Sequence, residues 1–453
     1  MARGATFDCE IEERIGDAIG KEIISLGGNT FGGVCVNLLR HPAWGRAQET
    51  FGEDPMHVGA MGASIVRGVE RYANAVVKHF ALNSMENARF FVDVHVEERT
   101  LHEVYLRHFK RIIMEEKASF VMSSYNQVNG HYAGENNDLL NLILKQKWGF
   151  KGAIMTDFVF GLRDAKKSML SGQDLEMPFK QTFDAKLPGL IKSGEVPMER
   201  LDDAVLRLMR VQRRHRQSVP STFSKGDHAA LALQAAEESI VLLKNQGNLL
   251  PLKAGTKPLK VALIGALAKV ANTGDHGSSN TQPEHVVTCE EGLVHALGKE
   301  NVTFNSGDDL EACTKVALAA EVVILVVGYS FKDEGEFVIP KPRPEEMALF
   351  PKPKLGEVYY LLKMMAQGLK DACFGRSNHT IGEGGDRTSL QLGAHDEALI
   401  EAVASVNENV IVVVMSGSAF ICEKWRNKVR SILCLWYGDE MVHFFWDKKH
   451  TNE

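Results

Sequence analysis

One carboxylate in this chain stands where a buried strand would deliver it to an active-site mouth. The apolar run Gly152-Ala153-Ile154-Met155 ends in Thr156-Asp157, and an aromatic residue and a helix-like segment follow. In a parallel α/β barrel the carboxyl ends of the strands share one face, and residues there carry the chemistry. Asp157 therefore suits a nucleophile, a base or a metal ligand. For an isolated strand the plainer interpretation is a helix cap.

The residues around Asp157 form an ordered set of short motifs. Along the chain these are Asn37-Leu38-Leu39-Arg40-His41-Pro42, Trp44-Gly45-Arg46, Lys78-His79-Phe80, Met122-Ser123-Ser124-Tyr125-Asn126, Lys147-Trp148-Gly149-Phe150 and Asp174-Leu175-Glu176-Met177-Pro178. A single motif of this length is weak evidence, but the whole series in this order is specific. The chain resembles glycoside hydrolase family 3, the β-glucosidase and β-xylosidase family, over nearly its whole length.

The resemblance implies a retaining exo-β-glycosidase, most simply a β-glucosidase that removes terminal non-reducing glucose. Such an enzyme uses two carboxylates. One attacks the anomeric carbon, and the other protonates the leaving oxygen and later activates water. By resemblance Asp157 is the nucleophile and forms a covalent glycosyl intermediate, and no metal or organic cofactor is implied. The family's β-N-acetylhexosaminidase branch is disfavoured, because its histidine-containing loop is replaced here by Ala81-Leu82-Asn83.

The acid/base carboxylate has three candidates. In many family members it lies on a loop of the second domain within a Glu-Gly-x-Asp-Arg pattern, which Glu383-Gly384-Gly385-Asp386-Arg387 matches. Glu334 and Glu336 follow a strand candidate that ends at Gly328, where the loop glutamate is also expected. Glu383 is the first choice, Glu334 the second and Glu336 the third. Since one acid suffices, two of the three are ordinary loop residues.

Further residues match family positions around the bound sugar; they are Arg46, Lys78, His79, Met122, Tyr125 and Phe158. The resemblance implies that the three basic residues bind the glycone and that Met122 and Tyr125 line the first subsite. Phe158 replaces the family's usual tryptophan, whose flat ring stacks on a sugar. Plainer interpretations remain for two of them, since Arg46 would pair with Glu49 or Glu53 and His79 would be a core residue.

Strand and helix candidates alternate through the first half of the chain. The strand candidates are 34–39, 75–78, 119–122 and 152–157, and the helix candidates are 8–27, a helix opened by Asp54-Pro55, 98–116, 139–146, 183–193 and 198–214. This alternation predicts a (β/α)8-type barrel in residues 1–215 that carries the nucleophile. Arg46, Lys78, His79 and Asp157 are then expected to converge at one rim.

A second domain is predicted after a linker at 216–226. A helix candidate at 228–244, strand candidates at 261–264, 322–327, 410–415 and 432–435, and a helix candidate at 396–404 follow. They predict a three-layer α/β sandwich in residues 227–453 that carries the acid/base loop. The stretch near 340–378 is interpreted as an insertion, and the loop 274–279 as part of the active-site rim or the domain interface.

Composition narrows the classes of partner. The 453 residues have a hydrophobic content of 44% and a net charge of −6, which gives no basic field for nucleic acid. No apolar run approaches the ~20 residues of a membrane helix. The 7 cysteines are scattered without a CxxC pair, which argues against a disulfide framework or a zinc site. The partner that remains is the β-glucoside or oligosaccharide that the resemblance implies, and a homo-oligomer stays open.

Both ends of the chain depart from the family pattern. Family members carry more chain before Ala2, including the first barrel strand and a glycone-binding aspartate, and they continue beyond Trp436-Tyr437-Gly438. We therefore expect both domains to be incomplete, with a gap in the barrel beside the strand 34–39. The second hypothesis is a catalytically impaired or vestigial sugar-binding protein. No apolar signal-peptide core is visible at the start, and compartment, sugar and linkage stay open.

Overall fold

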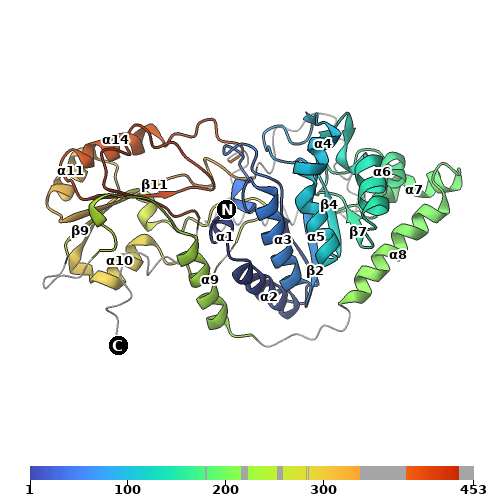
Figure 1. Cartoon of the computed structure of the whole chain (residues 1–453), viewed down its shortest axis with the longest axis horizontal. Coiled ribbons are helices and arrows are strands. Elements are labelled where there is room, and N and C mark those ends of the chain that lie inside the picture. Colours follow the sequence, from blue (N-terminus) through green and yellow to red (C-terminus); the bar gives the residue numbers. More distant parts are fainter. Residues whose placement is uncertain are drawn as a thin grey trace, which may run out of the picture.

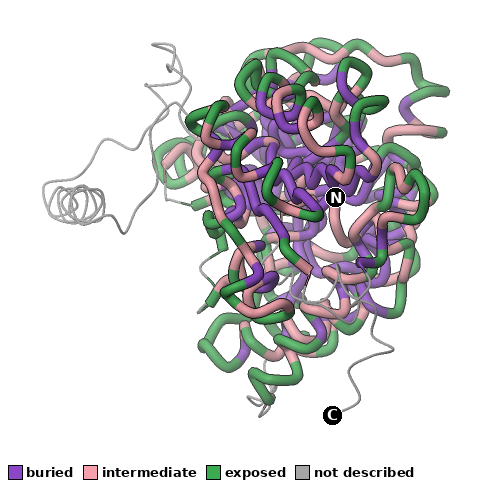
Figure 2. Tube along the Cα trace, turned by 90° about the vertical axis from the view of Figure 1, so that its left-hand side faces the viewer, coloured by how far each residue is buried: buried purple, intermediate pink, exposed green. Residues whose placement is uncertain are grey.

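The computed structural model describes residues 1–178, 181–215, 223–252, 259–281, 283, 285–336 and 384–437. They form two α/β units that lie side by side, the first in blue to green and the second in green to red (Figure 1). The N-terminus lies near the junction between the units (Figure 1). Buried residues fill the interior of the molecule, and exposed residues follow the outer helices and loops (Figure 2).

The first unit is built on a parallel sheet in the order β1-β2-β4-β7. Its strands are β1 (Thr30–Cys35), β2 (Asn74–Phe80), β4 (Phe120–Ser123) and β7 (Ala153–Met155). A parallel bridge from Met155 to Leu175 extends the sheet beyond β7. Among the described strands β1 pairs only with β2, so the sheet is open at β1. All four strands end toward the same edge, which is what the sequence predicted for the site residues.

Helices and short elements surround this sheet. The helices are α1 (Ala2–Ala5), α2 (Cys9–Ser25), α3 (Pro55–Val69), α4 (Glu98–Thr100), α5 (Arg107–Glu116), α6 (Ala165–Ser171), α7 (Thr182–Lys192) and α8 (Met198–Arg214), with π-helical turns at Leu101–Tyr105 and Asp138–Lys147. A small sheet joins β3 (Asp93–Val94), β5 (Gln127–Val128) and β6 (His131–Tyr132). Asp54 caps α3 by accepting the N–H groups of Met56 and His57, and Pro55 occupies the first helical position.

The second unit is a sheet in the order β10-β9-β11-β12-β13-β8. Its strands are β8 (Val241–Asn245), β9 (Val261–Ile264), β10 (Val302–Asn305), β11 (Val322–Gly328), β12 (Val410–Met415) and β13 (Ser431–Cys434), and its helices are α9 (Lys225–Ser239), α10 (Cys289–Leu297), α11 (Leu310–Leu318) and α14 (Ala394–Ala404). Alternate residues of β11 pack into two separate apolar clusters, one on each face. The sheet is thus buried on both sides, which makes a three-layer sandwich.

Most predicted elements are confirmed, and α8, β9 and β12 have the predicted bounds. The strand predicted at 34–39 is wrong in its bounds, because β1 runs from Thr30 to Cys35. The helix predicted at 228–244 is wrong in residues 240–244, because α9 ends at Ser239 and β8 pairs antiparallel with β13. Residues 240–243 form an apolar run whose periodicity fits a helix as well as a strand. The run becomes a strand because it pairs with β13 at the edge of the sheet. The helix predicted at 98–116 is interrupted by the π-helical turn Leu101–Tyr105. The segment 216–222 and the insertion near 340–378 lie outside the described residues.

The two units meet through a close approach of three glycines. Gly335 and Gly385 of the second unit form an antiparallel bridge with N···O distances of 3.3 and 3.0 Å. Gly45 of the first unit faces this bridge, and a Cβ atom placed on Gly45 would lie 2.2 Å from the Gly385 oxygen and 2.4 Å from the Gly335 oxygen. Only a residue without a side chain fits here, because both neighbours are backbone.

We therefore expect Gly45→Ala to weaken the junction of the two units. Overpacking of this kind costs roughly 1–3 kcal/mol, measured as the free energy of unfolding in a denaturant titration. Gly189→Ala in α7 is the matched control, because its Cβ would meet no atom within 4 Å, and helix propensity predicts a gain of about 0.5–1 kcal/mol. Equal stability of Gly45→Ala and the parent chain would contradict the close approach.

Candidate active site

A cavity of about 1080 Å³ lies between the two units. The first unit contributes the residues that the sequence singled out: Arg46, Lys78, His79, Met122, Tyr125, Asp157 and Phe158. The second unit contributes Glu336 together with the polar segment 278–281 and residues near the ends of β12 and β13. The structure thus brings the predicted first-unit residues to one cavity, and the loop 274–279 also borders it.

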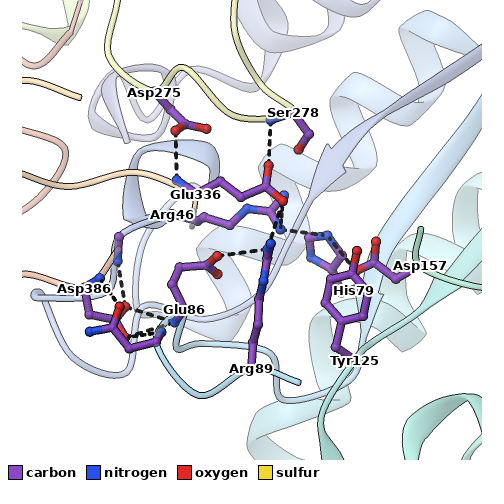
Figure 3. A network of polar contacts seen from close by, with 12 residues as sticks. Arg46, His79, Glu86, Arg89, Tyr125, Asp157, Asp275, Ser278, Glu336 and Asp386 are labelled. Atoms are coloured by element: carbon purple, nitrogen blue, oxygen red, sulfur yellow. Dashed lines mark hydrogen bonds and ion pairs between the residues drawn. The ribbon is translucent and has the colours of Figure 1, made fainter. Parts of the chain in front are cut away.

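The strand ends place these side chains. Lys78 and His79 lie near the carboxyl end of β2, Met122 lies in β4, and Asp157 follows β7 by two residues. Because the strands are parallel, their carboxyl ends meet at the edge that faces the second unit. Figure 3 shows His79, Tyr125 and Asp157 gathered at this edge, with Arg46 extending toward them.

Asp157 has one engaged and one unengaged carboxylate oxygen. Its Oδ1 atom accepts the N–H group of Phe158 at 2.8 Å. Its Oδ2 atom is buried without a hydrogen bond among the described residues and lies 3.7 Å from His79 Nε2. Burial raises the pKa of Asp157, while the charges of Arg46, Arg89 and Lys78 act in the opposite direction. The site therefore holds a desolvated carboxylate with a free oxygen among cations, which suits nucleophilic attack.

His79 is held as a neutral imidazole of one tautomer. Its Nδ1 atom lies 3.0 Å from Asn37 Oδ1, an acceptor, so Nδ1 carries the proton. Its Nε2 atom lies 3.2 Å from Arg46 Nη1, a donor, so Nε2 accepts. Asn37 also accepts the main-chain N–H of His79 and donates to its carbonyl, both at 2.8 Å. Burial, with Arg46 and Lys78 nearby, lowers the pKa of His79 well below its usual value.

Arg46 links the two units electrostatically. Its guanidinium is 1% exposed and binds Glu49 through two hydrogen bonds of 2.7 and 2.8 Å. The Nη1 atom lies 3.6 Å from Glu336 Oε1 on the second unit. The predicted ion pair with Glu49 is confirmed, and Arg46 also lines the cavity, while its role in binding the glycone stays a prediction.

Glu336 is the candidate glutamate that lines the cavity with Asp157. Its carboxylate accepts from Arg89 Nη1 at 2.8 Å and from the Ser278 N–H at 2.6 Å. Its own N–H donates to Asp275 Oδ1 at 2.8 Å. Burial alone would raise the pKa of Glu336, but Arg46 and Arg89 outweigh burial and lower it well below the usual value. In this arrangement Glu336 is an ionised partner of two arginines.

Glu334 is engaged elsewhere. It is 1% exposed, lies 3.0 Å from Arg387 Nε, and accepts from the Gly417 N–H at 2.6 Å and the Tyr437 hydroxyl at 2.5 Å. Glu334 is not among the residues that line the cavity. Glu383, the first choice for the acid, lies outside the described residues. Of the two described candidates, only Glu336, the third choice from the sequence, lines the cavity with Asp157.

Sequence reasoning missed Arg89. Arg89 is 2% exposed, and its guanidinium carbon lies 5.0 Å from the centre of the Tyr125 ring. It follows Lys78-His79 by ten residues in a loop without periodicity, so only its charge among apolar neighbours could have signalled it. Tyr125 donates its hydroxyl to the Phe158 carbonyl at 2.9 Å. Phe158 is 45% exposed at the cavity mouth, where a flat ring is free to stack on a ligand.

Three carboxylates of the site lie close together. Oxygen atoms of Glu49, Asp275 and Glu336 lie within 4.8 Å of one another. Each already has a donor, since Glu49 binds Arg46, Glu336 binds Arg89, and Asp275 accepts from the Ser279 hydroxyl and the Glu336 N–H. Arginines therefore neutralise Glu49 and Glu336, whereas Asp275 is held by a hydroxyl and a main-chain N–H, and burial raises its pKa.

None of the helices in the described part of the chain has the length and apolar character that crossing a bilayer requires.

Fold and site together define a two-domain α/β protein whose cavity lies between the domains, at the carboxyl ends of the first sheet. The model of the glycosyl hydrolase family 3 N terminal domain matches residues 1–211, and that of the C-terminal domain matches residues 240–352 and 366–444. The chain belongs to glycosyl hydrolase family 3.

Several named proteins are similar to this chain. Thermostable beta-glucosidase B of Acetivibrio thermocellus is 32% identical over 96% of this chain and 53% of its own length. An exo-alpha-(1->6)-L-arabinopyranosidase of Bifidobacterium longum is 30% identical over 95% of this chain and 53% of its own length. The crystal structure of a beta-D-glucoside glucohydrolase from Trichoderma reesei, 26% identical, matches with a TM-score of 0.82 over 98% of this chain and 62% of that one. The chain spans about half the length of the curated relatives.

The neutral state of His79 is testable in the intact protein. Its pKa lies well below the usual value, so we expect it to stay uncharged with the proton on Nδ1 as the pH falls through 6, where an unperturbed histidine titrates. Nitrogen NMR of histidine-labelled protein reports both the charge and the tautomer. Asn37→Asp is the matched variant, because a carboxylate beside Nδ1 favours the imidazolium and moves the titration to higher pH. A charged His79 at pH 6 in the parent chain would refute this assignment.

Proposed function

We propose that this chain hydrolyses terminal, non-reducing β-glucosides by double displacement, with Asp157 as the nucleophile and Glu336 as the acid/base. The supporting observation is that these two carboxylates line one cavity, one from each unit. A retaining mechanism needs such a pair, with one carboxylate to attack and one to exchange protons. The named relatives support the substrate class, because a beta-glucosidase is among them.

Glu336 replaces Glu334 as the preferred described acid for a physical reason. A carboxyl group that must give and take a proton has to reach the leaving oxygen from the wall of the cavity. Glu336 lines the cavity that Asp157 also lines, whereas Glu334 does not line it and binds Arg387, Gly417 and Tyr437. Glu383 remains an untested alternative and is included in the experiment below.

The residues around Asp157 have separate tasks in this proposal. Arg46 and Lys78 present donors to sugar hydroxyls, and neutral His79 adds a polar edge beside Asp157. Arg46 and Arg89 lower the pKa of Glu336, so the acid step requires its carboxylate to move away from these cations toward the leaving oxygen. Phe158 lies at the mouth, where the leaving group would pass.

A second candidate function is removal of α-L-arabinopyranose, because a relative of similar identity carries that name. Both candidates use the same pair of carboxylates and differ in the groups on the sugar ring. A third is sugar binding without turnover. A panel of aryl β-glucoside, aryl β-xyloside and aryl α-L-arabinopyranoside separates the first two, and absence of turnover with retained binding of glucose favours the third.

The nucleophile is tested by substitution and by trapping. We expect Asp157→Asn to lower kcat by roughly 10³-fold or more, since no covalent intermediate forms, while the unfolding midpoint stays near that of the parent chain. A 2-deoxy-2-fluoro glucoside should inactivate the parent chain, and peptide mass analysis should find the sugar on Asp157. Label on a different carboxylate would reject this residue as the nucleophile.

The acid is tested by the quality of the leaving group. Removing a general acid costs about 10²–10⁴-fold when the leaving oxygen needs a proton, so Glu336→Gln should lose most of its activity on methyl β-glucoside. A 2,4-dinitrophenyl β-glucoside needs no proton and should be cleaved with a far smaller loss in the glycosylation step. Glu334→Gln and Glu383→Gln serve as comparisons. If one of them shows this leaving-group dependence and Glu336→Gln does not, that residue is the acid.

A further inference from the structure

We propose that Asp386 is a positioning residue that fixes the acid Glu336 and the buried arginine Arg89 relative to each other across the domain junction. This inference rests on the proposed function of Glu336. Asp386 does not line the cavity, and it acts through the backbone of both units.

The Asp386 carboxylate binds two loops of the first unit at once. It accepts the main-chain N–H of Gly45 at 3.0 Å, that of Glu86 at 3.0 Å from both oxygens, and that of Asn87 at 2.9 Å. The Asp386 N–H donates in return to Asn87 Oδ1 at 3.0 Å. Figure 3 shows Asp386 beside Glu86, with dashed lines for the hydrogen bonds that the Asp386 carboxylate accepts. One carboxylate on the second unit thus ties together two segments of the first.

The segment that carries Asp386 also holds the acid. Gly385, its neighbour, pairs with Gly335 through two backbone hydrogen bonds, and Gly335 directly precedes Glu336. On the other side, Arg387 binds Glu334 at 3.0 Å, and its N–H donates to the Ala43 carbonyl at 2.8 Å. The residues that flank Asp386 therefore hold the backbone on one side of Glu336.

The loop that Asp386 holds also carries the arginine. Glu86, whose N–H the carboxylate accepts, binds Arg89 Nη1 at 2.9 Å through its side chain. The same Nη1 atom lies 2.8 Å from Glu336 Oε1. A closed path thus runs from Asp386 through Glu86 and Arg89 to Glu336, and back through Gly335 and Gly385. Because catalytic rate falls steeply when a proton donor is displaced by about 1 Å, loosening this path should affect the acid step.

Asp386→Asn tests this with almost no change in volume. The amide keeps one acceptor oxygen, and its NH₂ group would face a backbone N–H. At least one hydrogen bond to the two loops of the first unit is therefore lost. The measured quantity is the ratio of kcat/KM for 2,4-dinitrophenyl β-glucoside to that for methyl β-glucoside. Effects on sugar binding cancel in this ratio, whereas displacement of the acid raises it. We expect a rise of about 10-fold or more for Asp386→Asn, and a larger rise for Glu336→Gln.

Two further variants show whether the effect is specific to Asp386. Asp309→Asn is the matched control, because Asp309 also accepts two main-chain N–H groups, at the start of α11 within the second unit. It should leave the ratio unchanged. Asn87→Ala at an exposed position removes only the return bond and should raise the ratio a few-fold. An unchanged ratio in Asp386→Asn, with a raised ratio in Glu336→Gln, overturns the positioning role. An unchanged ratio in Glu336→Gln overturns the acid assignment and the catalytic part of this inference with it.

Amide hydrogen exchange tests the hydrogen bonds of Asp386 independently of turnover. In Asp386→Asn, exchange should become faster in peptides that cover Gly45, Glu86 and Asn87, and also in the peptide that covers 334–336. Faster exchange only in the peptides that cover Gly45, Glu86 and Asn87 would mean that Asp386 joins the domains without positioning Glu336. That result overturns the proposed positioning role. Asp309→Asn should change exchange only at the start of α11.

Discussion

The site depends on one constraint, which is that guanidinium groups buried between two domains need carboxylates beside them. Arg46 and Arg89 are 1% and 2% exposed, and an unpaired charge at such depth costs several kcal/mol. Glu49 and Glu86 come from the same loops as the arginines, and Glu336 comes from the other domain. Glu336 thus adds a carboxylate from the second domain to both arginines, and the docked position that allows these contacts is also the one that brings Glu336 to the cavity that Asp157 lines.

The glycine contacts at the junction add a second constraint. Gly45 lies against the backbone bridge of Gly335 and Gly385, where a side chain on Gly45 would collide with both carbonyl oxygens. The carboxylate of Asp386 then satisfies main-chain N–H groups that the approach would otherwise bury without partners. Electrostatics, backbone packing and hydrogen-bond satisfaction thus favour a single relative position of the two units.

The sequence predicted what local patterns determine. Asp157, Lys78 and His79 follow apolar runs, and a parallel sheet brings the ends of such runs together, so their convergence could be anticipated. The order of the acid candidates could not be derived in this way. Glu334 and Glu336 are two residues apart, and what separates them is the pairing with Arg387 or with Arg89, which depends on contacts between distant segments. Arg89 was missed for the same reason. The strand β8 was predicted as part of a helix, because a short apolar run does not reveal that it will pair with β13.

The same carboxylate has two incompatible tasks in the proposed cycle. In the structure Glu336 neutralises Arg46 and Arg89, and those cations keep its pKa low. As the acid it must carry a proton, which these cations oppose. Neutral sugar hydroxyls leave the arginine charges in place, so the conflict is resolved only if the Glu336 carboxylate moves away from Arg46 and Arg89 toward the leaving oxygen. The position of Glu336 relative to these two arginines therefore decides whether it can act as the acid.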